Sequence, residues 1–283
     1  MSPADLMNVS EWIGRTEARS DVVTPGPIAA LSATLDREDP QPQPGDVLPP
    51  LWHWLYFLDR HRQSELGPDG HGRRGGFLPP IPLPRRMWAG GRFEFHHPLR
   101  VGDQIKRETR IVDIKEKAGR SGPLVFILVR HEISNAEGLA FAEEHDIVYR
   151  DHGPAGPVQL APADAAWERM IKPDDVLLFR YSALTFNAHR IHYDRRYATE
   201  VEGYPGLVVH GPLIATLLMD LLRRNEARND ARANVARFNF RAVSPLFDTG
   251  PFAVCGKPGG KTVALWAKDA AGNLAMTAEA SIG

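Results

Sequence analysis

The chain has 283 residues, of which 43% are hydrophobic and 24% charged, a balance typical of a globular protein with a full core. Its 34 basic and 35 acidic residues give a net charge of −1 without blocks of like charge, which argues against a nucleic-acid tract or a membrane-surface patch. Cys255 is the single cysteine, so an internal disulfide is excluded, and with no basic leader and no apolar stretch of about 18 residues we expect a cytoplasmic protein outside the membrane.

The first half of the chain, residues 1–150, contains one strongly apolar segment ahead of its strands. This segment, LWHWLYFLDR at 51–60, follows two prolines, and we expect it to form a helix. Further on, 125–150 reads as two strands joined by a hairpin turn at Asn135-Ala-Glu-Gly138.

The second half repeats this pattern. Residues 151–165 are rich in Pro, Ala and Gly and form a predicted linker, after which 166–283 make a second half. Residues 237–240, RFNF, resemble RFEF at 92–95, and 262–282 parallel 125–150, with a second hairpin turn at 270–273. A repeat of this length predicts a duplicated domain, although two unrelated β-meanders would also look alike.

Residues 211–224, GPLIATLLMDLLRR, predict a helix that is buried nearly all round, because leucine and isoleucine occupy most of its faces. Gly211 and Pro212 suit its start, and Arg223 and Arg224 suit the negative end of its dipole. A long apolar helix wrapped by a bent antiparallel sheet is the hot-dog architecture. We therefore expect an α+β double hot dog, with two sheets side by side, each around a helix.

The segment 179–194, FRYSALTFNAHRIHYD, concentrates the groups that can move protons. Asn187, His189 and His192 fall within six positions, ahead of a predicted helical stretch that ends at Gly203. Taken alone, such a histidine pair also fits a solvated or structurally bonded role. No cysteine or third histidine lies nearby to complete a zinc site, so we expect no metal.

The run from Asn187 to Asp194, NAHRIHYD, resembles the hydratase motif of MaoC-like (R)-specific enoyl-CoA hydratases. The longer string TFNAHRIHYD is similar to a subgroup with this pattern: type 2 hydroxyacyl-thioester dehydratases, and bacterial hydratases of itaconyl-CoA and mesaconyl-type thioesters. The resemblance extends over the whole chain, including the duplicated layout. It places His192 on the catalytic histidine and Asn187 where the family usually has a catalytic aspartate. An asparagine cannot act as a base, but its amide can hold a water molecule.

A second element, GLVVHGP at 206–212, lies at the distance that the family requires. The N–H of Gly211 is an unpaired donor at the positive end of a helix dipole, and His210 precedes it. A thioester carbonyl bound there would be polarised, and the enolate oxygen would be stabilised as its charge develops. On its own, a His-Gly-Pro before a helix also has an ordinary capping explanation.

The first half lacks both of these elements, since the matching stretch 23–39 contains no histidine and no His-Gly pair precedes the segment at 51. We expect this half to have lost catalysis and to provide a substrate tunnel. The Gly/Pro-rich loop 67–84 with Arg85 and Arg86 could contact the acyl chain or the phosphates of CoA, or be a plain surface excursion. Trp88 could lie beside the acyl group.

The resemblance implies a hydro-lyase that adds water to the double bond of an enoyl-CoA thioester, without a cofactor. In this reading Gly211 binds the thioester carbonyl, Asn187 holds a water, and His192 takes its proton. Arg190, His189, His210 and the tyrosines Tyr181 and Tyr193 are candidate substrate-binding residues. Arg190 could bind a carboxylate on a short dicarboxylic acyl group, as in itaconyl- or mesaconyl-CoA, or could pair with Asp194 or Glu200.

Three alternatives stay open at this point. The substrate could be a fatty 3-hydroxyacyl thioester, carried on CoA or on acyl carrier protein. A hot-dog thioesterase would need a poised carboxylate or hydroxyl, for which the apolar helix offers Thr216 and Asp220. A non-catalytic acyl-binding module would turn Asn187 and His192 away from any pocket. A homodimer is the expected assembly, although one chain could be complete as a monomer.

Overall fold

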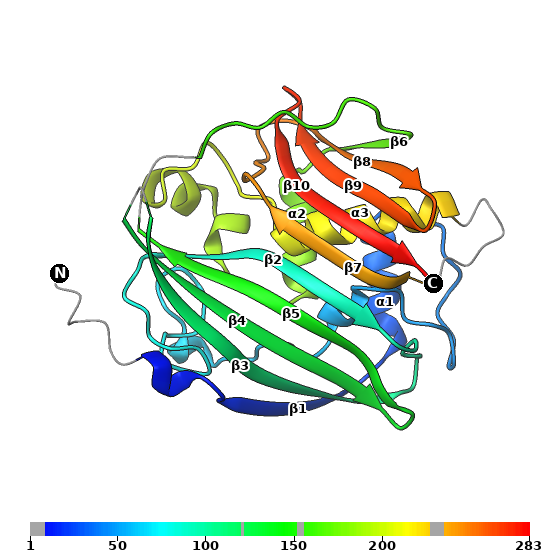
Figure 1. Cartoon of the computed structure of the whole chain (residues 1–283), viewed down its shortest axis with the longest axis horizontal. Helices are drawn as coiled ribbons and strands as arrows, with labels where there is room; N and C mark the ends of the chain where they lie inside the picture. The colour runs from blue at the N-terminus through cyan, green and yellow to red at the C-terminus, as the bar shows by residue number, and fades with distance from the viewer. Residues whose placement is uncertain (1–8, 120–121, 152–155, 227–234) are drawn as a thin grey trace.

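One continuous antiparallel sheet runs through the molecule in the computed structural model, which describes residues 9–119, 122–151, 156–226 and 235–283 (Figure 1). Ten strands of the described chain follow in the order β1-β3-β4-β5-β2-β7-β10-β9-β8-β6. Their bounds are Thr16–Val22 (β1), Arg85–Phe95 (β2), Gln104–Gly119 (β3), Gly122–Asn135 (β4), Gly138–Arg150 (β5), Trp167–Ile171 (β6), Val235–Ala242 (β7), Phe252–Gly259 (β8), Thr262–Asp269 (β9) and Leu274–Ile282 (β10).

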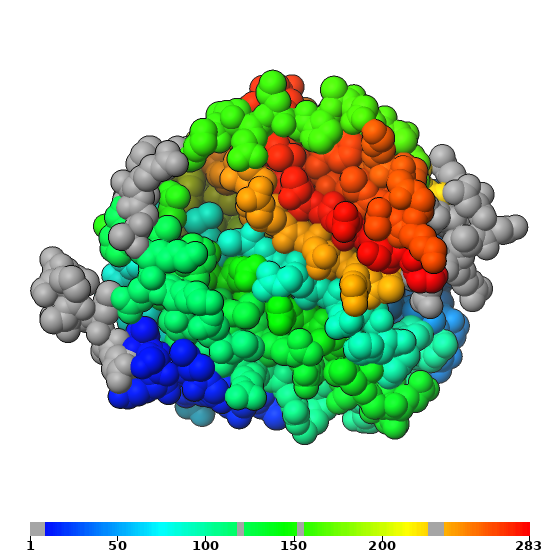
Figure 2. Space-filling model, in the orientation of Figure 1, coloured from blue at the N-terminus to red at the C-terminus, as the bar shows by residue number. Residues whose placement is uncertain are grey.

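The two halves meet where β2 pairs with β7. These strands carry the two similar segments recognised in the sequence, and Phe93 lies directly opposite Phe238 in the register. The expected duplicated hot-dog architecture is confirmed, but the two sheets are joined edge to edge into one. Figure 2 shows the outer face of this sheet as a continuous surface, with the blue-to-green strands of the first half against the orange and red strands of the second.

The turns that join neighbouring strands are as predicted. Asn135 pairs with Gly138 across the β4–β5 hairpin, and Gly138 takes a φ of 110° that glycine adopts without steric cost. The turn between β9 and β10 is held by Asp269, whose carboxylate accepts hydrogen bonds from the backbone of Ala271 and Asn273.

Helix α3 (Gly211–Glu226) is the predicted apolar helix, and it lies behind the strands of the second half (Figure 1). It packs on β6, β8, β9 and β10. All of its residues from Leu213 to Leu222 are buried, so the prediction of a helix buried nearly all round is confirmed.

The segment 51–60 does not form the predicted helix. Only Trp52–Leu55 makes a short 3-10 turn, between Leu51 with a φ of 69° and Phe57 with a φ of 54°. These left-handed residues end the helical path on both sides, while Trp52, Leu55 and Phe57 are still buried. The apolar pattern therefore predicted the burial of this segment correctly, but its prediction of a helix was wrong.

The first half has a short helix in place of a long central one. Helix α1 (Pro25–Thr34) follows β1 within the stretch 23–39, just as α2 (Asp175–Leu184) follows β6 in the second half. The concave face of β3, β4 and β5 is instead covered by chain segments around 48–57 and 77–83. Between them lies a cavity of about 900 Å3.

Two predicted segments fall partly outside the described chain. Residues 1–8 of the first half and 152–155 of the linker lie there, and the linker boundaries remain a prediction. The predicted helical stretch before Gly203 is present, with one turn of π-helix at Tyr197–Val201. Among the helices that the structure describes, none has the length and hydrophobicity to cross a membrane.

A buried ion-pair network ties α3 to both halves. Asp220, which is 1% exposed, accepts hydrogen bonds from Arg37 beyond α1, Arg169 on β6 and Arg224 one turn along α3. Removing one member of a buried ionic network leaves charges in the interior without a partner.

We therefore expect Asp220→Asn to lower the free energy of unfolding by about 3 to 5 kcal/mol, as measured by urea denaturation at 25 °C. The exposed pair of Lys257 and Asp164 supplies the control, and Asp164→Asn should leave the transition unchanged. An Asp220→Asn protein as stable as the parent would show that the network adds nothing.

Candidate active site

The loop after α2 carries the cluster of polar groups seen in the sequence. Helix α2 begins at the Asp174 cap and ends at Leu184, after which Phe186 adopts a φ of 51° and turns the chain. The N–H of Asn187 then donates to the carbonyl of Ser182 at 2.8 Å. The side-chain oxygen of Asn187 accepts from the N–H of His189 at 3.0 Å, and its amide nitrogen has no acceptor among the described residues.

His192 is held in one orientation by the backbone. Its Nδ1 lies 2.7 Å from the carbonyl oxygen of Val208, and because a carbonyl only accepts, Nδ1 carries the proton. The neutral ring therefore presents an unprotonated Nε2. Burial lowers the pKa of His192 to about 4, so the ring is a free base at neutral pH.

The ring of His210 packs against one face of the His192 ring. Its ring stacks on that of His192 with centroids 3.7 Å apart and planes 18° from parallel. It is 0% exposed, Nε2 lies 2.8 Å from the Ser182 hydroxyl, and burial holds its pKa well below the usual range. His210 is thus packed beneath His192 and away from the wall of the cavity, and its role in binding substrate stays a prediction.

Gly211 opens α3 directly after this stack. Its N–H has no acceptor in the described chain, and the next residue, Pro212, has no N–H at all. The helix start thus presents one backbone donor at the positive end of the dipole, as the sequence predicted. Such a donor can stabilise a carbonyl oxygen that becomes negative.

Arg190 is fully engaged within the protein. Its guanidinium donates to Asp194 at 2.7 and 2.9 Å and to the carbonyl of Pro68 at 2.9 Å. Of the two roles that the sequence left open, the ion pair with Asp194 is the one observed. The binding of a substrate carboxylate by Arg190 stays a prediction.

The cavity of about 900 Å3 reaches from this loop across the sheet of the first half. Among the predicted site residues, Asn187, Tyr181, Trp88 and Tyr193 line it, together with Pro212. The others are adjacent to its wall without forming it: His189, Arg190, His192, His210 and Gly211. Tyr181 is buried, and its hydroxyl is hydrogen bonded to Thr216, so its ring is what it offers to a ligand.

The first half also contributes a loop that the sequence indicated only in outline. The ring of His71 lies 4.1 Å from that of His189, and its Nδ1 is 3.0 Å from the Asp69 carboxylate. Gly70 passes so close to the loop after α2 that a Cβ there would lie 1.8 Å from the carbonyl oxygen of Ala188. The Gly/Pro-rich composition predicted a loop, and its glycines allow this contact.

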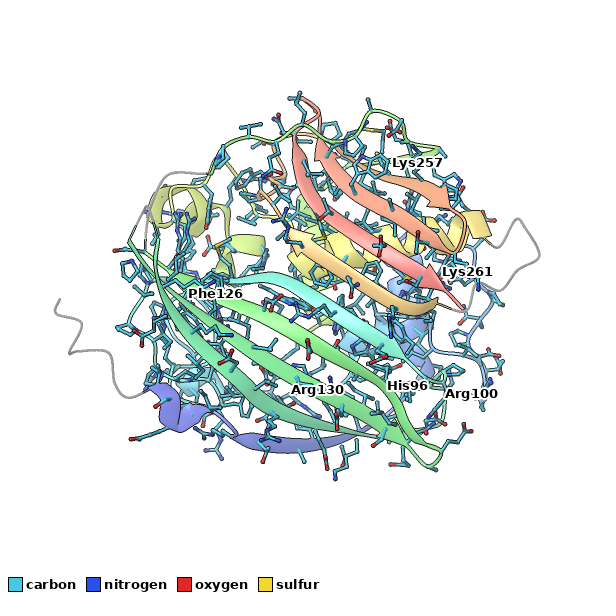
Figure 3. All side chains as sticks on the ribbon, in the orientation of Figure 1. His96, Arg100, Phe126, Arg130, Lys257 and Lys261 are labelled. Atoms are coloured by element: carbon cyan, nitrogen blue, oxygen red, sulfur yellow. The ribbon has the colours of Figure 1, made fainter. Side chains whose placement is uncertain are left out.

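The sequence did not lead us to expect a second set of polar side chains at the cavity. The residues Arg107, Thr109, His131, Glu143 and His145 line the cavity or lie beside it on β3, β4 and β5. The signal was available: on β4, Val125, Ile127 and Val129 alternate inward, and the next inward position is His131. Figure 3 labels Phe126 and Arg130, which belong to the other set of alternate positions on that strand.

Among the described residues, two sets of side chains have a spacing that could hold a metal ion: Asp69 with His71 and His189, and Glu143 with His131 and His145. In the first set the Asp69 carboxylate is bonded to His71 through both the ring and the backbone N–H. In the second set Glu143 is bonded to His53 at 2.9 Å and lies 3.3 Å from His145. Both sets are thus internally paired.

The sequence matches the family described as hydroxyacyl-thioester dehydratase type 2 over residues 51–248. It is also 51% identical to the mesaconyl-C(4)-CoA hydratase of Chloroflexus aurantiacus over 287 aligned positions, which cover 100% of both chains. The chain belongs to the type 2 hydroxyacyl-thioester dehydratase family. As a member of this family it is an enzyme of the hydro-lyase class.

Solved structures agree on the architecture of this dehydratase family member. A MaoC-like dehydratase superposes with a TM-score of 0.72 at 16% identity, over 97% of this chain and 99% of the other. A Mycobacterium tuberculosis protein described as having a double hot-dog fold superposes with a TM-score of 0.58 at 14% identity, over 95% and 96% of the two chains. The double hot-dog fold is therefore confirmed.

We expect the ring of His192 to titrate with a midpoint of about 4 and to keep its proton on Nδ1 above that pH. Nitrogen-15 spectra of labelled histidines over pH 3 to 8 measure both properties, with His192→Gln assigning the signal. A midpoint near the ordinary value of about 6.5, or a proton on Nε2, would contradict the geometry.

Proposed function

We propose that this enzyme reversibly hydrates the double bond of a short, branched, dicarboxylic enoyl-CoA thioester, most simply mesaconyl-C4-CoA or itaconyl-CoA, to a hydroxyacyl-CoA such as citramalyl-CoA. The observation that carries the proposal is the 51% identity to a mesaconyl-C(4)-CoA hydratase along the entire chain. The arrangement of Asn187, His192 and the Gly211 N–H supports it, because these groups supply what a hydration needs.

In this mechanism the thioester carbonyl accepts a hydrogen bond from the N–H of Gly211. The helix dipole of α3 favours the negative charge that builds on this oxygen when the β-carbon is attacked. Glycine at this position leaves the approach open, since a Cβ there would meet nothing within 4 Å. A substrate carbonyl could therefore reach the backbone donor directly.

His192 acts as the base and then as the acid. Its Nε2 takes a proton from a water molecule while the hydroxide adds to the β-carbon. The same proton then passes to the α-carbon, so that one water is added and His192 returns to its neutral form. The Val208 carbonyl keeps Nδ1 protonated throughout, which leaves Nε2 as the only nitrogen that changes state.

Asn187 takes the place of the usual aspartate and is proposed to hold the water. Its oxygen already accepts the His189 N–H, and its unpaired amide nitrogen points to a donor role toward the water oxygen. Such an amide can position the attacking water molecule without taking a proton from it. The base function then rests on His192 alone.

The thioesterase alternative has little support from α3. The hydroxyl of Thr216 donates to the carbonyl of Pro212, and Asp220 is surrounded by three arginines. Neither group is free to drive hydrolysis. The fatty-acyl alternative is disfavoured by the charged groups that line the cavity, since burying an alkyl chain against them leaves polar groups without partners.

We further propose that the enzyme works as a homodimer in the cytoplasm and uses no cofactor. The single cysteine is buried, and burial raises its pKa to about 11, which suits an unreactive thiol in a reducing compartment. Sedimentation equilibrium measures the assembly, and a mass of one chain at micromolar concentration would refute the dimer.

The first test of the function is a panel of mesaconyl-C4-CoA, itaconyl-CoA and crotonyl-CoA, followed by mass spectrometry. We expect a gain of one water on the dicarboxylic thioesters and no release of free thiol. Thiol release would identify a thioesterase instead. A protein that binds the thioesters but converts none of them would be a binding module.

We expect His192→Ala and Asn187→Ala each to lower kcat by at least about a hundredfold, because each removes a positioned group of the proton-transfer step. His96, an exposed residue at the far end of β2 (Figure 3), provides the control, and His96→Ala should keep parental kcat. Folded His192→Ala protein with near-parental kcat would refute the mechanism.

A further inference from the structure

The concave face of the first-half sheet carries a band of polar side chains where an apolar core is expected. On one side of the band, Ile105, Ile133 and Phe141 belong to the main core, and on the other Ile111 and Val129 belong to a second, smaller core. The polar band lies between these two apolar clusters and consists of Arg107, Thr109, His131, Glu143 and His145.

The members of the band are neighbours in the sheet. Thr109 is paired with His131 on β4, and His131 is paired in turn with Glu143 on β5. The Thr109 hydroxyl lies 2.8 Å from Nδ1 of His131, and the rings of His131 and His145 are 4.5 Å apart. The polar band is therefore one connected layer across three strands.

Glu143 is a buried member of the polar band and contacts two histidine rings. It is 2% exposed, and its carboxylate lies 2.9 Å from Nε2 of His53 and 3.3 Å from Nε2 of His145. Burial alone would raise the pKa of Glu143, but these two histidines hold it well below its usual range, so it is an anion. The carboxylate thus faces the Nε2 atoms of both rings.

Arg107 is the member of the band whose guanidinium has no hydrogen-bond acceptor among the described residues. It lines the cavity, its guanidinium lies 5.2 Å from the ring of Phe57, and its Nε is buried without an acceptor. The nearest carboxylate oxygen described is that of Glu17, 3.9 Å away and 3.4 Å from Arg19. A half-buried guanidinium with unused donors is suited to bind a carboxylate through two parallel hydrogen bonds.

The band and the candidate active site share one cavity. Asn187 and Pro212 line the same space as Arg107, His131 and His145. Trp88 bridges the two halves of the sheet beside it, with its ring 4.2 Å from that of His145 and 5.4 Å from that of Phe240 on β7. An acyl group whose thioester is at Gly211 thus extends toward the band.

We propose that the polar band, with Arg107 as its principal cation and His131 and His145 beside it, is the subsite that binds the free carboxylate of the acyl group and selects dicarboxylic over monocarboxylic enoyl thioesters. This inference rests on the proposed function and adds to it the residues that determine specificity. It replaces Arg190, which is already paired, as the carboxylate-binding residue. A bound carboxylate provides the acceptors that Arg107 lacks.

The test compares two thioesters that differ only at the recognised group. Mesaconyl-C4-CoA carries a methyl and a carboxylate on its β-carbon, and 3-methylcrotonyl-CoA has a second methyl in place of the carboxylate. We expect Arg107→Met to lower kcat/KM for mesaconyl-C4-CoA on the order of a hundredfold, as for removal of one partner of a buried charge pair. The value for 3-methylcrotonyl-CoA should change by less than about threefold, because that substrate makes no such pair.

Arg107→Lys serves as the conservative variant and should recover part of the selectivity, since it restores the charge without the two-pronged geometry. Conversion of 3-methylcrotonyl-CoA also reports that Arg107→Met is folded. If Arg107→Met lowers kcat/KM equally for both substrates, or if the wild-type enzyme has the higher kcat/KM for 3-methylcrotonyl-CoA, the proposed subsite is refuted. The proposed hydratase function would not be affected by either result.

Binding separates this inference from the proposed function. In a His192→Ala background, calorimetry should show that Arg107→Met weakens binding of mesaconyl-C4-CoA and leaves that of 3-methylcrotonyl-CoA unchanged. This result would support the subsite even if the enzyme hydrates neither thioester. If the enzyme hydrates mesaconyl-C4-CoA but Arg107→Met affects the binding of both thioesters equally, the subsite is overturned. One equivalent of zinc in the purified protein, lost in His131→Ala, would also overturn it by identifying a metal site.

Discussion

The fold depends on one constraint: a single long helix lies beneath a sheet of two halves. Helix α3 packs on β8, β9 and β10 with buried leucine side chains, and it begins at Gly211, next to Pro212 at the wall of the cavity. The first half has no helix of that length among its described residues, so its sheet bends over a cavity. The same asymmetry therefore produces the hydrophobic core of one half and the cavity of the other, with the start of α3 beside that cavity.

His192, the proposed proton-transfer group, is oriented and kept neutral by its immediate neighbours. A backbone carbonyl sets the tautomer of His192, a stacked His210 sets its plane, and burial sets its pKa. None of these requires a carboxylate partner. An asparagine at position 187 is therefore compatible with the proposed role of His192 as a base, because the surroundings already keep this ring neutral and oriented. In the proposed mechanism Asn187 binds the water molecule, while the Ser182 hydroxyl contacts the His210 ring beneath His192.

The sequence was most informative where neighbours in the chain are also neighbours in space. The buried helix at 211–224, the repeated strands and the hairpin turns follow from periodicity and turn residues, and the family motif located Asn187, His192 and Gly211. The segment 51–60 failed because its apolar residues are buried in a non-helical path around left-handed Leu51 and Phe57. The polar band was missed because its members come from three strands, and only the strand register brings Thr109, His131 and Glu143 into one row. The pairing of Arg190 with Asp194 was one of two alternatives that spacing alone could not separate.

The pairing of β2 with β7 also has a consequence for the history of such a chain. Where two identical subunits must associate, each substitution appears twice, and their association weakens on dilution. Here the two sheets are hydrogen bonded within one polypeptide, so the junction between Phe93 and Phe238 persists at any concentration. A first copy that lacks the histidine motif and a long helix can therefore stay joined to its companion. Gene duplication followed by fusion thus allows one repeat to retain the reactive groups while the other diversifies its lining, and selectivity can evolve without disturbing the chemistry.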